Sequence, residues 1–279
     1  MIKLIASDID ETLVDKNKNV PQRNREAIAK AQEMGIVVML ATGRGPYELH
    51  DIPDQAGVID EDRFIICCNG AIIIKALDRE IVSSLPLEFK YAKAVFDYCK
   101  DNNLQAYIYT LDKKYAINLD PIERNHIYTN DSKVIEIKDG NIDFLEDELI
   151  LKALIKDPNI DFLHSLEVDI AAITNYDVEI AYSSDMFMEI NAKGVDKGIA
   201  LKKVCDHYGF DISETLTIGD NYNDVAMLEA AGTSVAVNNA HLQVKDVATY
   251  VTDATNEEGA VGEAIEKYVL NNKQRSTQI

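Results

Sequence analysis

Short runs in which every residue is apolar alternate with helical patterns along the first part of the chain. Ile36–Leu40 is one such run, and Phe64–Cys68 is another. Strands that are apolar at every position are typical of a parallel sheet covered by helices on both faces. Ahead of the first run, Ala27, Ile28 and Ala31 recur at helical spacing. This alternation predicts an α/β fold with a doubly wound, Rossmann-like, mostly parallel sheet.

The middle of the chain has a different pattern. Its expected strands are shorter and alternate apolar with polar residues; they are Gln105–Tyr109, Tyr115–Asn118, Val134–Lys138, Leu151–Lys156 and Val178–Tyr182. Such alternation is typical of a sheet with one solvated face, so an α+β unit is expected here. From Lys193 onward the earlier rhythm of strand and helix returns. We therefore predict one α/β domain formed by residues 1–82 and 190–279, with an α+β domain inserted at 83–189.

Acidic residues outnumber basic ones by 48 to 28, which gives a formal net charge of −20. A surface this acidic repels nucleic-acid phosphates and anionic lipid head groups, so neither is expected as a partner. No apolar run approaches the roughly 20 residues needed to cross a bilayer. The beginning of the chain has no signal-peptide pattern, and the four cysteines form no C-x-x-C pair. We expect a cytoplasmic protein with no membrane association and no obligate protein partner.

Polar clusters follow three of the expected core strands, and a lysine precedes the last of these strands. The residues are Asp8 and Asp10, then Thr42, Gly43 and Arg44, then Lys197, and finally Asp220, Asn223 and Asp224. Ligands of open α/β sheets bind beyond the carboxyl ends of the strands. Four aspartates gathered there would repel one another unless a divalent cation held them, and an all-oxygen donor set is typical of Mg²⁺. The alternative is that these acids stay apart in solvent.

The same residues match, in order, the four motifs of a known family. The chain resembles the haloacid-dehalogenase (HAD) superfamily, and most closely its Cof-type IIB phosphatases with a large inserted cap. The matching motifs are Asp8-x-Asp10-x-Thr12, Thr42, Lys197 and Gly219-Asp220-x-x-Asn223-Asp224, and the similarity extends through Cys68-Asn69-Gly70-Ala71. The second and third motifs straddle residues 83–189, where this branch carries its cap. The resemblance therefore implies a HAD core with an inserted α+β cap that selects the substrate.

The resemblance also implies a role for each matching residue. Asp8 would be the nucleophile that forms an aspartyl phosphate, and Asp10 would be the general acid and base. Mg²⁺ would bind Asp8, Asp220 and the backbone carbonyl of Asp10, with Asp224 either a ligand or a residue that orients the ligands. The residues that would contact or orient the substrate phosphate are Ile9, Thr42, Gly43, Arg44, Lys197 and Asn223. For Arg44, a structural ion pair is an equally good interpretation.

Glu11 departs from the family pattern, which usually has glycine or aspartate at this point. Glycine would ease the turn after the nucleophile, and Glu11 adds a negative charge near the phosphate site. We expect the Glu11 side chain to face outward and to leave the chemistry unchanged.

The residues and the resemblance together predict a Mg²⁺-dependent phosphatase of small phosphorylated metabolites. The resemblance implies sugar phosphates foremost, with flavin or pyridoxal phosphates as alternatives. A phosphomutase of the same branch would instead pass the phosphoryl group to a second sugar hydroxyl. A receiver-like signalling module also phosphorylates an aspartate beside Mg²⁺, threonine and lysine, but it lacks both the acid at Asp10 and the inserted domain. Haloacid dehalogenation would leave Asp10 and Asp220 without a use.

Overall fold

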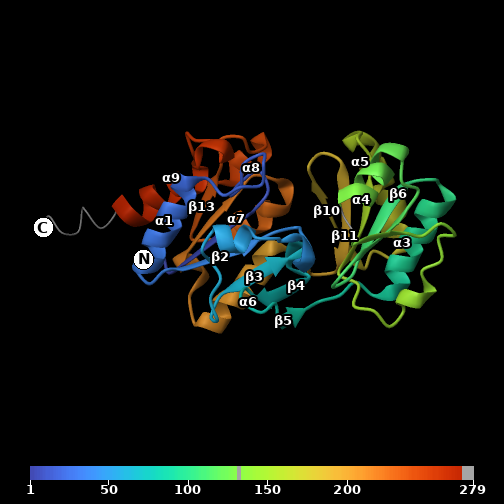
Figure 1. Cartoon of the computed structure of the whole chain (residues 1–279), viewed down its shortest axis with the longest axis horizontal. Helices are drawn as coiled ribbons and strands as arrows, with labels where there is room; N and C mark the ends of the chain where they lie inside the picture. The colour runs from blue at the N-terminus through green and yellow to red at the C-terminus, as the bar shows by residue number, and fades with distance from the viewer. Residues whose placement is uncertain (131–132, 272–279) are drawn as a thin grey trace, which may run out of the picture. The chain divides into compact units, whose positions relative to one another are not determined.

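The chain forms two compact units, each with its own sheet. The computed structural model describes residues 1–130 and 133–271, with the backbone alone for 126–130. The first unit consists of Met1–Arg44, Leu49–Ser83 and Asp196–Ile279, and the second of Gly45–Glu48 and Ser84–Val195 (Figure 1). Within the described residues, no helix combines the length and the apolar character that crossing a membrane requires.

The sheet of the first unit is mainly parallel. Its strands follow the order β14-β13-β12-β1-β2-β3-β4-β5. The pairs from β14 to β3 are parallel, and β4 runs antiparallel to β3. The strands are β1 (Leu4–Ser7), β2 (Val37–Ala41), β3 (Phe64–Cys67), β4 (Ile72–Lys75), β5 (Ile81–Ser84), β12 (Thr215–Gly219), β13 (Thr233–Ala236) and β14 (Tyr250–Val251).

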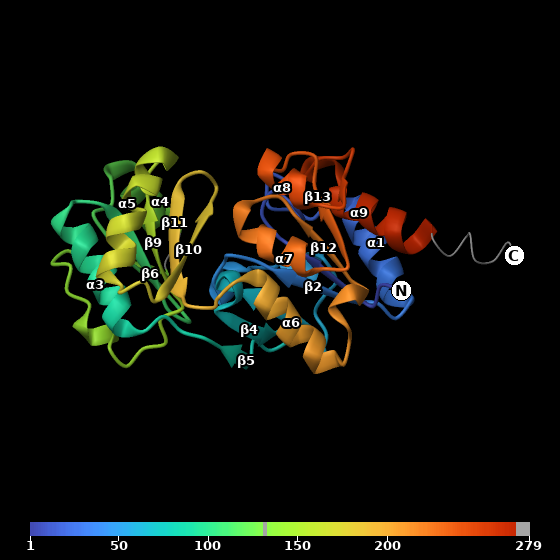
Figure 2. The same ribbon diagram turned by 180° about the vertical axis from the view of Figure 1, so that it is seen from behind.

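Helices cover this sheet on both faces. They include α1 (Gln22–Glu33), α2 (Ile52–Gln55), α6 (Lys197–Tyr208), α7 (Val225–Ala230), α8 (Leu242–Val247) and α9 (Ala260–Ile265). The pair α1 and α9 lies side by side, as does the pair α6 and α7 (Figures 1 and 2). Leu201 of α6 and Met227 of α7 share one apolar cluster with Leu4 and Met39 of the sheet. Every residue of β1, β2, β3 and β12 is buried, so the predicted doubly wound α/β fold is confirmed.

The second unit combines a mixed sheet with helices. Its strand order is β10-β11-β9-β6-β7-β8, with antiparallel pairing except between β7 and β8. The strands are β6 (Gln105–Tyr109), β7 (Lys114–Ile117), β8 (Val134–Glu136), β9 (Lys152–Lys156), β10 (Val178–Ser183) and β11 (Phe187–Ala192), and the helices are α3 (Phe89–Asp101), α4 (Pro121–Asn130) and α5 (Ile160–Ile173). Phe96 of α3 and Leu163 of α5 belong to the apolar core formed with Ile108 and Ile155. This is the α+β character that the alternating strands predict.

The expected boundary between residues 189 and 190 lies inside β11, whose last residues continue the mixed sheet to Ala192. The compact second unit ends at Val195, directly before the residues that start α6. The assignment of residues 83–189 to substrate selection stays a prediction.

The order of the parallel strands determines which loops meet. Strand β1 lies between β12 and β2, and Ser7 is in register with both Ile218 and Leu40. Because all three strands run in the same direction, their carboxyl ends meet at one edge of the sheet. The residues that follow them, Asp8, Thr42 and Asp220, are therefore brought to that edge.

Candidate active site

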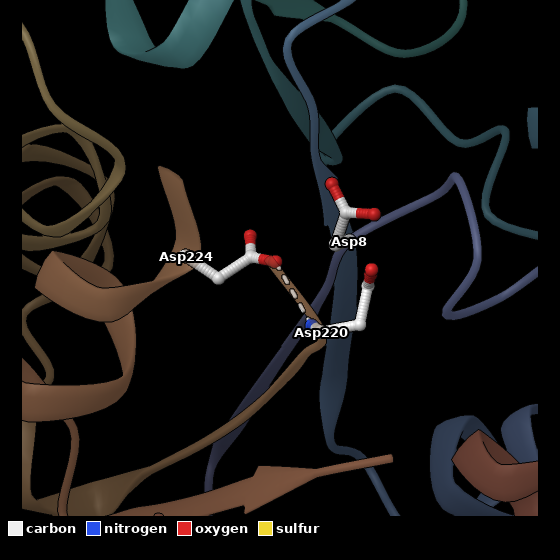
Figure 3. Close-up of side chains that lie close together, drawn as sticks. All are labelled: Asp8, Asp220 and Asp224. Carbon is white, nitrogen blue, oxygen red and sulfur yellow. Dashed lines mark hydrogen bonds between the residues drawn. The ribbon is translucent and has the colours of Figure 1, made fainter. Parts of the chain in front are cut away.

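Three buried aspartates form the centre of the site. Asp8 follows β1, whereas Asp220 and Asp224 come from the loop after β12. One carboxylate oxygen from each of the three lies within 4.8 Å of the others (Figure 3). Gathered carboxylates in a buried setting repel one another, and oxygen donors of this kind suit a hard divalent cation. The cluster therefore fits a divalent metal site, as the spacing of these residues predicts.

The loop after β12 is built around the Asp224 carboxylate. Its Oδ2 accepts hydrogen bonds from the backbone N–H groups of Asp220 and Asn221, both at 3.0 Å. Gly219 allows this loop conformation, because a Cβ at that position would lie 2.6 Å from Asp224 Cγ. The other side-chain oxygen, Oδ1, faces Lys197. Asp224 thus uses both oxygens to hold the protein's own groups.

Lys197 is the buried cation of the cluster. It is the first residue of α6, whose N-cap residue Asp196 accepts a hydrogen bond from the N–H of Ile199. The Lys197 side chain is 0% exposed, and its Nζ lies 2.6 Å from Asp8 Oδ1 and 2.6 Å from Asp224 Oδ1. Burial works to lower the pKa of Lys197, but Asp224 and Asp8 outweigh it and raise that pKa above its ordinary value. The ammonium group therefore stays charged.

Asp8 and Asp220 are harder to ionise than ordinary carboxyls. Burial raises the pKa of Asp8 to about 7; Lys197 opposes the shift, whereas Asp224 and Asp10 add to it. Burial, with repulsion from Asp8, also raises the pKa of Asp220 well above its ordinary value. Thr12 donates a hydrogen bond to Asp220 Oδ1 and partly offsets that effect. A bound divalent cation would favour the ionised form of both groups.

Asp10 points its carboxylate toward a different set of partners. Arg44 binds it through two hydrogen bonds, Nε to Oδ2 at 2.7 Å and Nη2 to Oδ1 at 2.7 Å. Lys18 donates a third hydrogen bond to Oδ1, also at 2.7 Å. Burial works to raise the pKa of Asp10, but these two cations outweigh it and lower the pKa to about 2. The structure thus shows the ion pair that was one of two interpretations of Arg44, and it adds Lys18, which the sequence analysis missed.

The predicted phosphate-contacting residues lie on both sides of Asp8. Thr42 follows β2, is buried, and accepts a hydrogen bond from the N–H of Arg44 through its Oγ1 at 3.1 Å. Gly43 lies between these two residues. Ile9 is fully buried, and its carbonyl accepts hydrogen bonds from the N–H groups of Leu13 and Val14. For Ile9, Thr42, Gly43 and Arg44, contact with phosphate stays a prediction.

Glu11 behaves as expected from its departure from the family pattern. Its side chain is exposed, and its backbone has φ of +57°, in the left-handed region where glycine is usually favoured. The Glu11 carbonyl accepts a hydrogen bond from Asn239 Nδ2 at 2.7 Å, which holds the turn in this conformation. The extra carboxylate therefore faces outward.

Asn223 is expected to contact or orient the substrate phosphate, and the structure shows one partner of its side chain. Its Nδ2 donates a hydrogen bond to Asn69 Oδ1 at 3.0 Å. Asn69 lies in the turn between β3 and β4, outside the four motifs, and is 2% exposed. The sequence signal for this residue was present in Cys68-Asn69-Gly70-Ala71, which the similarity to the family covers without giving it a role.

Comparison with known proteins agrees with the fold and the site. The family model for haloacid dehalogenase-like hydrolases matches residues 5–265. The chain is 30% identical over 269 residues to the 5-amino-6-(5-phospho-D-ribitylamino)uracil phosphatase YcsE of Bacillus subtilis, covering 96% of each protein. It is also 27% identical to the phosphatase YwpJ of the same organism, covering 92% of this chain and 97% of that protein.

Two solved structures are similar over nearly the whole chain. A haloacid dehalogenase-like hydrolase from Bacteroides thetaiotaomicron has a TM-score of 0.80 and 30% identity, covering 96% of this chain and 99% of that one. The HAD subclass IIB sugar phosphatase BT4131 shares the fold, with a TM-score of 0.79, 22% identity and coverage of 95% and 98%.

The chain therefore belongs to the haloacid dehalogenase-like hydrolases, in the Cof-type subfamily IIB. It is a phosphatase, a phosphoric monoester hydrolase that acts on small phosphorylated metabolites. The mixed sheet of the second unit corresponds to the cap of this subfamily, which confirms the predicted fold class.

Proposed function

We propose that the chain is a Mg²⁺-dependent phosphatase that works through an aspartyl phosphate on Asp8. The placement of Asp8 carries this proposal. Its carboxylate is buried directly after β1, is held by Lys197, and lies in one cluster with Asp220 and Asp224. A carboxylate fixed beside a cation and a divalent-metal position is suited to attack phosphorus, because its charge is shielded from the incoming phosphate.

The reaction consists of two displacements at phosphorus. In the first, an oxygen of Asp8 forms a bond to phosphorus while the bond to the substrate oxygen breaks, and Asp10 gives its proton to the departing alkoxide. In the second, a water oxygen attacks phosphorus, Asp10 accepts a proton from that water, and the bond to Asp8 breaks. The products are an alcohol and inorganic phosphate, and both aspartates return to their initial protonation states.

The remaining residues hold the phosphoryl group and its charge. Thr42 and Gly43 follow β2, and their hydroxyl and N–H groups would donate to phosphoryl oxygens, with Lys197 as the fixed positive charge. Asp8, Asp220 and the Asp10 carbonyl would hold Mg²⁺, which neutralises developing negative charge when bound. Asp224 would position Lys197 and the loop, since both of its oxygens already accept hydrogen bonds from protein groups.

Asp10 cannot act as an acid while Arg44 and Lys18 hold its pKa at about 2. We propose that its carboxylate turns away from both cations before it carries a proton. Arg44 would then contact the substrate phosphate, which reconciles the two interpretations of this residue. The Lys18 contact is the more exposed of the two, because the Lys18 side chain is 55% exposed and that of Arg44 is 16% exposed.

We propose phosphorylated polyhydroxy compounds as the substrate class, with sugar phosphates first. Two similarities support this choice: YcsE, by its name, acts on a phosphoribitylamino compound, and BT4131 is a sugar phosphatase. A ribityl chain and a sugar share a phosphate ester beside several hydroxyl groups. Residues 83–189 would select among such compounds, as the inserted cap of the family does.

A screen of phosphorylated metabolites with Mg²⁺ and with excess EDTA tests the proposal. We expect inorganic phosphate to be released from hexose or ribityl phosphates faster than from pyridoxal phosphate or flavin mononucleotide. Asp8→Asn is the matched control and should be inactive on every compound. An isomeric sugar phosphate in place of inorganic phosphate would identify a phosphomutase. Full activity in EDTA, or turnover by Asp8→Asn, would contradict the mechanism.

A further inference from the structure

The turn that joins β3 to β4 is strained. Cys68, Asn69 and Gly70 all have positive φ, at +47°, +56° and +104°. Three successive residues in this region are unusual, since only glycine occupies it freely and asparagine is the side chain that tolerates it best. All three residues are buried. Strain of this kind persists only where surrounding contacts hold it, and it is concentrated at functional sites.

The contacts that hold the turn come from residues of the proposed catalytic motifs. The N–H of Asn69 donates to the carbonyl of Thr42 at 3.0 Å, and the N–H of Cys68 donates to the carbonyl of Arg44 at 2.9 Å. The opposite side of the turn lies against the start of α6. A Cβ on Gly70 would be 2.6 Å from the carbonyl oxygen of Asp196, the residue before Lys197. The turn therefore touches both the loop after β2 and the helix that carries the buried lysine.

The side chain of Asn69 reaches the third proposed motif. Its Oδ1 accepts the hydrogen bond from Asn223 Nδ2 at 3.0 Å. Asn223 lies one residue before Asp224, within the short turn Tyr222–Asp224 that places the Asp224 carboxylate beside Lys197. The left-handed backbone at Asn69 directs a short amide side chain to this position.

We infer that Asn69 is a positioning residue for catalysis, which acts by fixing the Asn223 side chain and, through it, the loop that holds Asp224 and Lys197. The inference rests on the proposed function, in which Asn223 and Lys197 bind or orient the substrate phosphate. It goes beyond that function because Asn69 belongs to none of the four motifs. The strained backbone is explained by the same role, since it directs the Asn69 amide at Asn223.

Asn69→Gly separates this role from a purely structural one. Glycine adopts φ of +56° without steric cost, so the turn keeps its conformation while the Oδ1 acceptor is lost. We expect kcat and kcat/KM for an aryl phosphate with Mg²⁺ to fall together by roughly 2- to 10-fold, the range for one neutral hydrogen bond. The thermal midpoint should change little. Asn103→Gly is the matched control, because Asn103 is also left-handed, at φ of +54°, but is exposed after α3.

A double-mutant cycle with Asn223→Ala then tests whether Asn69 affects catalysis through Asn223. If Asn69 acts through Asn223, Asn69→Gly should cost nothing further when Asn223 is already alanine. The inference would be overturned if Asn69→Gly lowered kcat and kcat/KM equally in the unaltered chain and in Asn223→Ala, or in neither. The proposed function would still stand in that case, provided that the unaltered chain hydrolyses the aryl phosphate. A loss that follows the fraction of unfolded protein at the assay temperature would overturn it as well. If the unaltered chain releases no phosphate from the aryl phosphate in Mg²⁺, the proposed function fails and the inference fails with it.

Discussion

The variant Lys197→Met would measure how much of the stability of the first unit depends on the buried ammonium group of Lys197. The Lys197 ammonium contacts Asp8 and Asp224 at 2.6 Å each, and its side chain is fully buried. Methionine keeps much of the apolar stem but removes the charge. The two carboxylates would then lie beside Asp220 without the cation that both of them contact, and the repulsion among the three would increase.

The expected loss of stability is large. Removing one partner of a buried ion pair costs about 3–5 kcal/mol. For a unit of this size, that corresponds to a decrease of roughly 6–20 °C in the thermal midpoint. Figure 3 shows why the cost should be at the upper end, since the other neighbours of Asp8 in the cluster are carboxylates.

The loss should also depend on pH. Burial already raises the pKa of Asp8 to about 7, against the opposing effect of Lys197, and removing Lys197 would raise it further. A carboxyl whose pKa is higher in the folded chain stabilises the fold below its unfolded pKa, and this contribution is lost as the pH rises through the folded value. The deficit of the variant should therefore be smaller at about pH 5 than at about pH 8.

Thermal unfolding followed by circular dichroism, with a chelator present, measures this effect. Lys202→Met is the matched control, because Lys202 is an exposed lysine of the same helix and its replacement should change stability by no more than about 0.5 kcal/mol. In an activity assay, Lys197→Arg should restore little of the rate lost in Lys197→Ala, because lysine acts here as a compact point charge. A Lys197→Met protein as stable as the unaltered chain at about pH 8 would refute the reasoning.

Three further predictions concern the same site. Chelation of the metal should abolish turnover. The variant Asp220→Ala should also lose the increase in thermal midpoint that Mg²⁺ gives the unaltered chain. If Mg²⁺ still raised the midpoint of that variant, the cation would bind elsewhere. With an aryl phosphate, intact-mass spectrometry after rapid quench should find one added phosphate on Asp10→Asn, because loss of the general base slows hydrolysis of the phosphoenzyme by roughly 10²–10⁴-fold. It should find none on Asp8→Asn, which lacks the nucleophile. A phosphorylated Asp8→Asn would exclude Asp8 as the nucleophile. Gly219→Ala should lower both activity and the midpoint, by about 1–3 kcal/mol in stability, since its Cβ would overlap Asp224; unchanged kinetics would show that the loop can move.

The core fold and the centre of the site could be predicted because they depend on local patterns that the sequence displays. Fully apolar runs marked β2 and β3, and parallel strands carry the residues that follow them to one edge. The similarity to a family then supplied the roles of Asp8, Asp220 and Lys197, which the structure brings together. The outward direction of Glu11 could be predicted as well, because the family varies at this position, and the side chain is exposed.

Other parts of the site could not be predicted because they depend on contacts between residues that no pattern relates. Lys18 reaches Asp10 from a loop whose sequence has no distinguishing motif. The hydrogen bond between Asn69 and Asn223 joins side chains 154 positions apart and needs a left-handed backbone at one of them. The end of the inserted unit also depends on strand pairing, because β11 continues the mixed sheet to Ala192 beside β10.

The balance of charge within the site gives a physical reason for the proposed dependence on a divalent cation. The protein as a whole carries a formal charge of −20, so its long-range field opposes a phosphate dianion. The nearby cations are paired with aspartates. Lys197 pairs with Asp8 and Asp224, and both Arg44 and Lys18 pair with Asp10. Attraction of the substrate therefore requires additional positive charge, which a divalent cation at the three-aspartate cluster would supply. Because the same cation would offset the repulsion that raises the pKa values of Asp8 and Asp220, metal binding would both ionise the nucleophile and make the site attractive to phosphate.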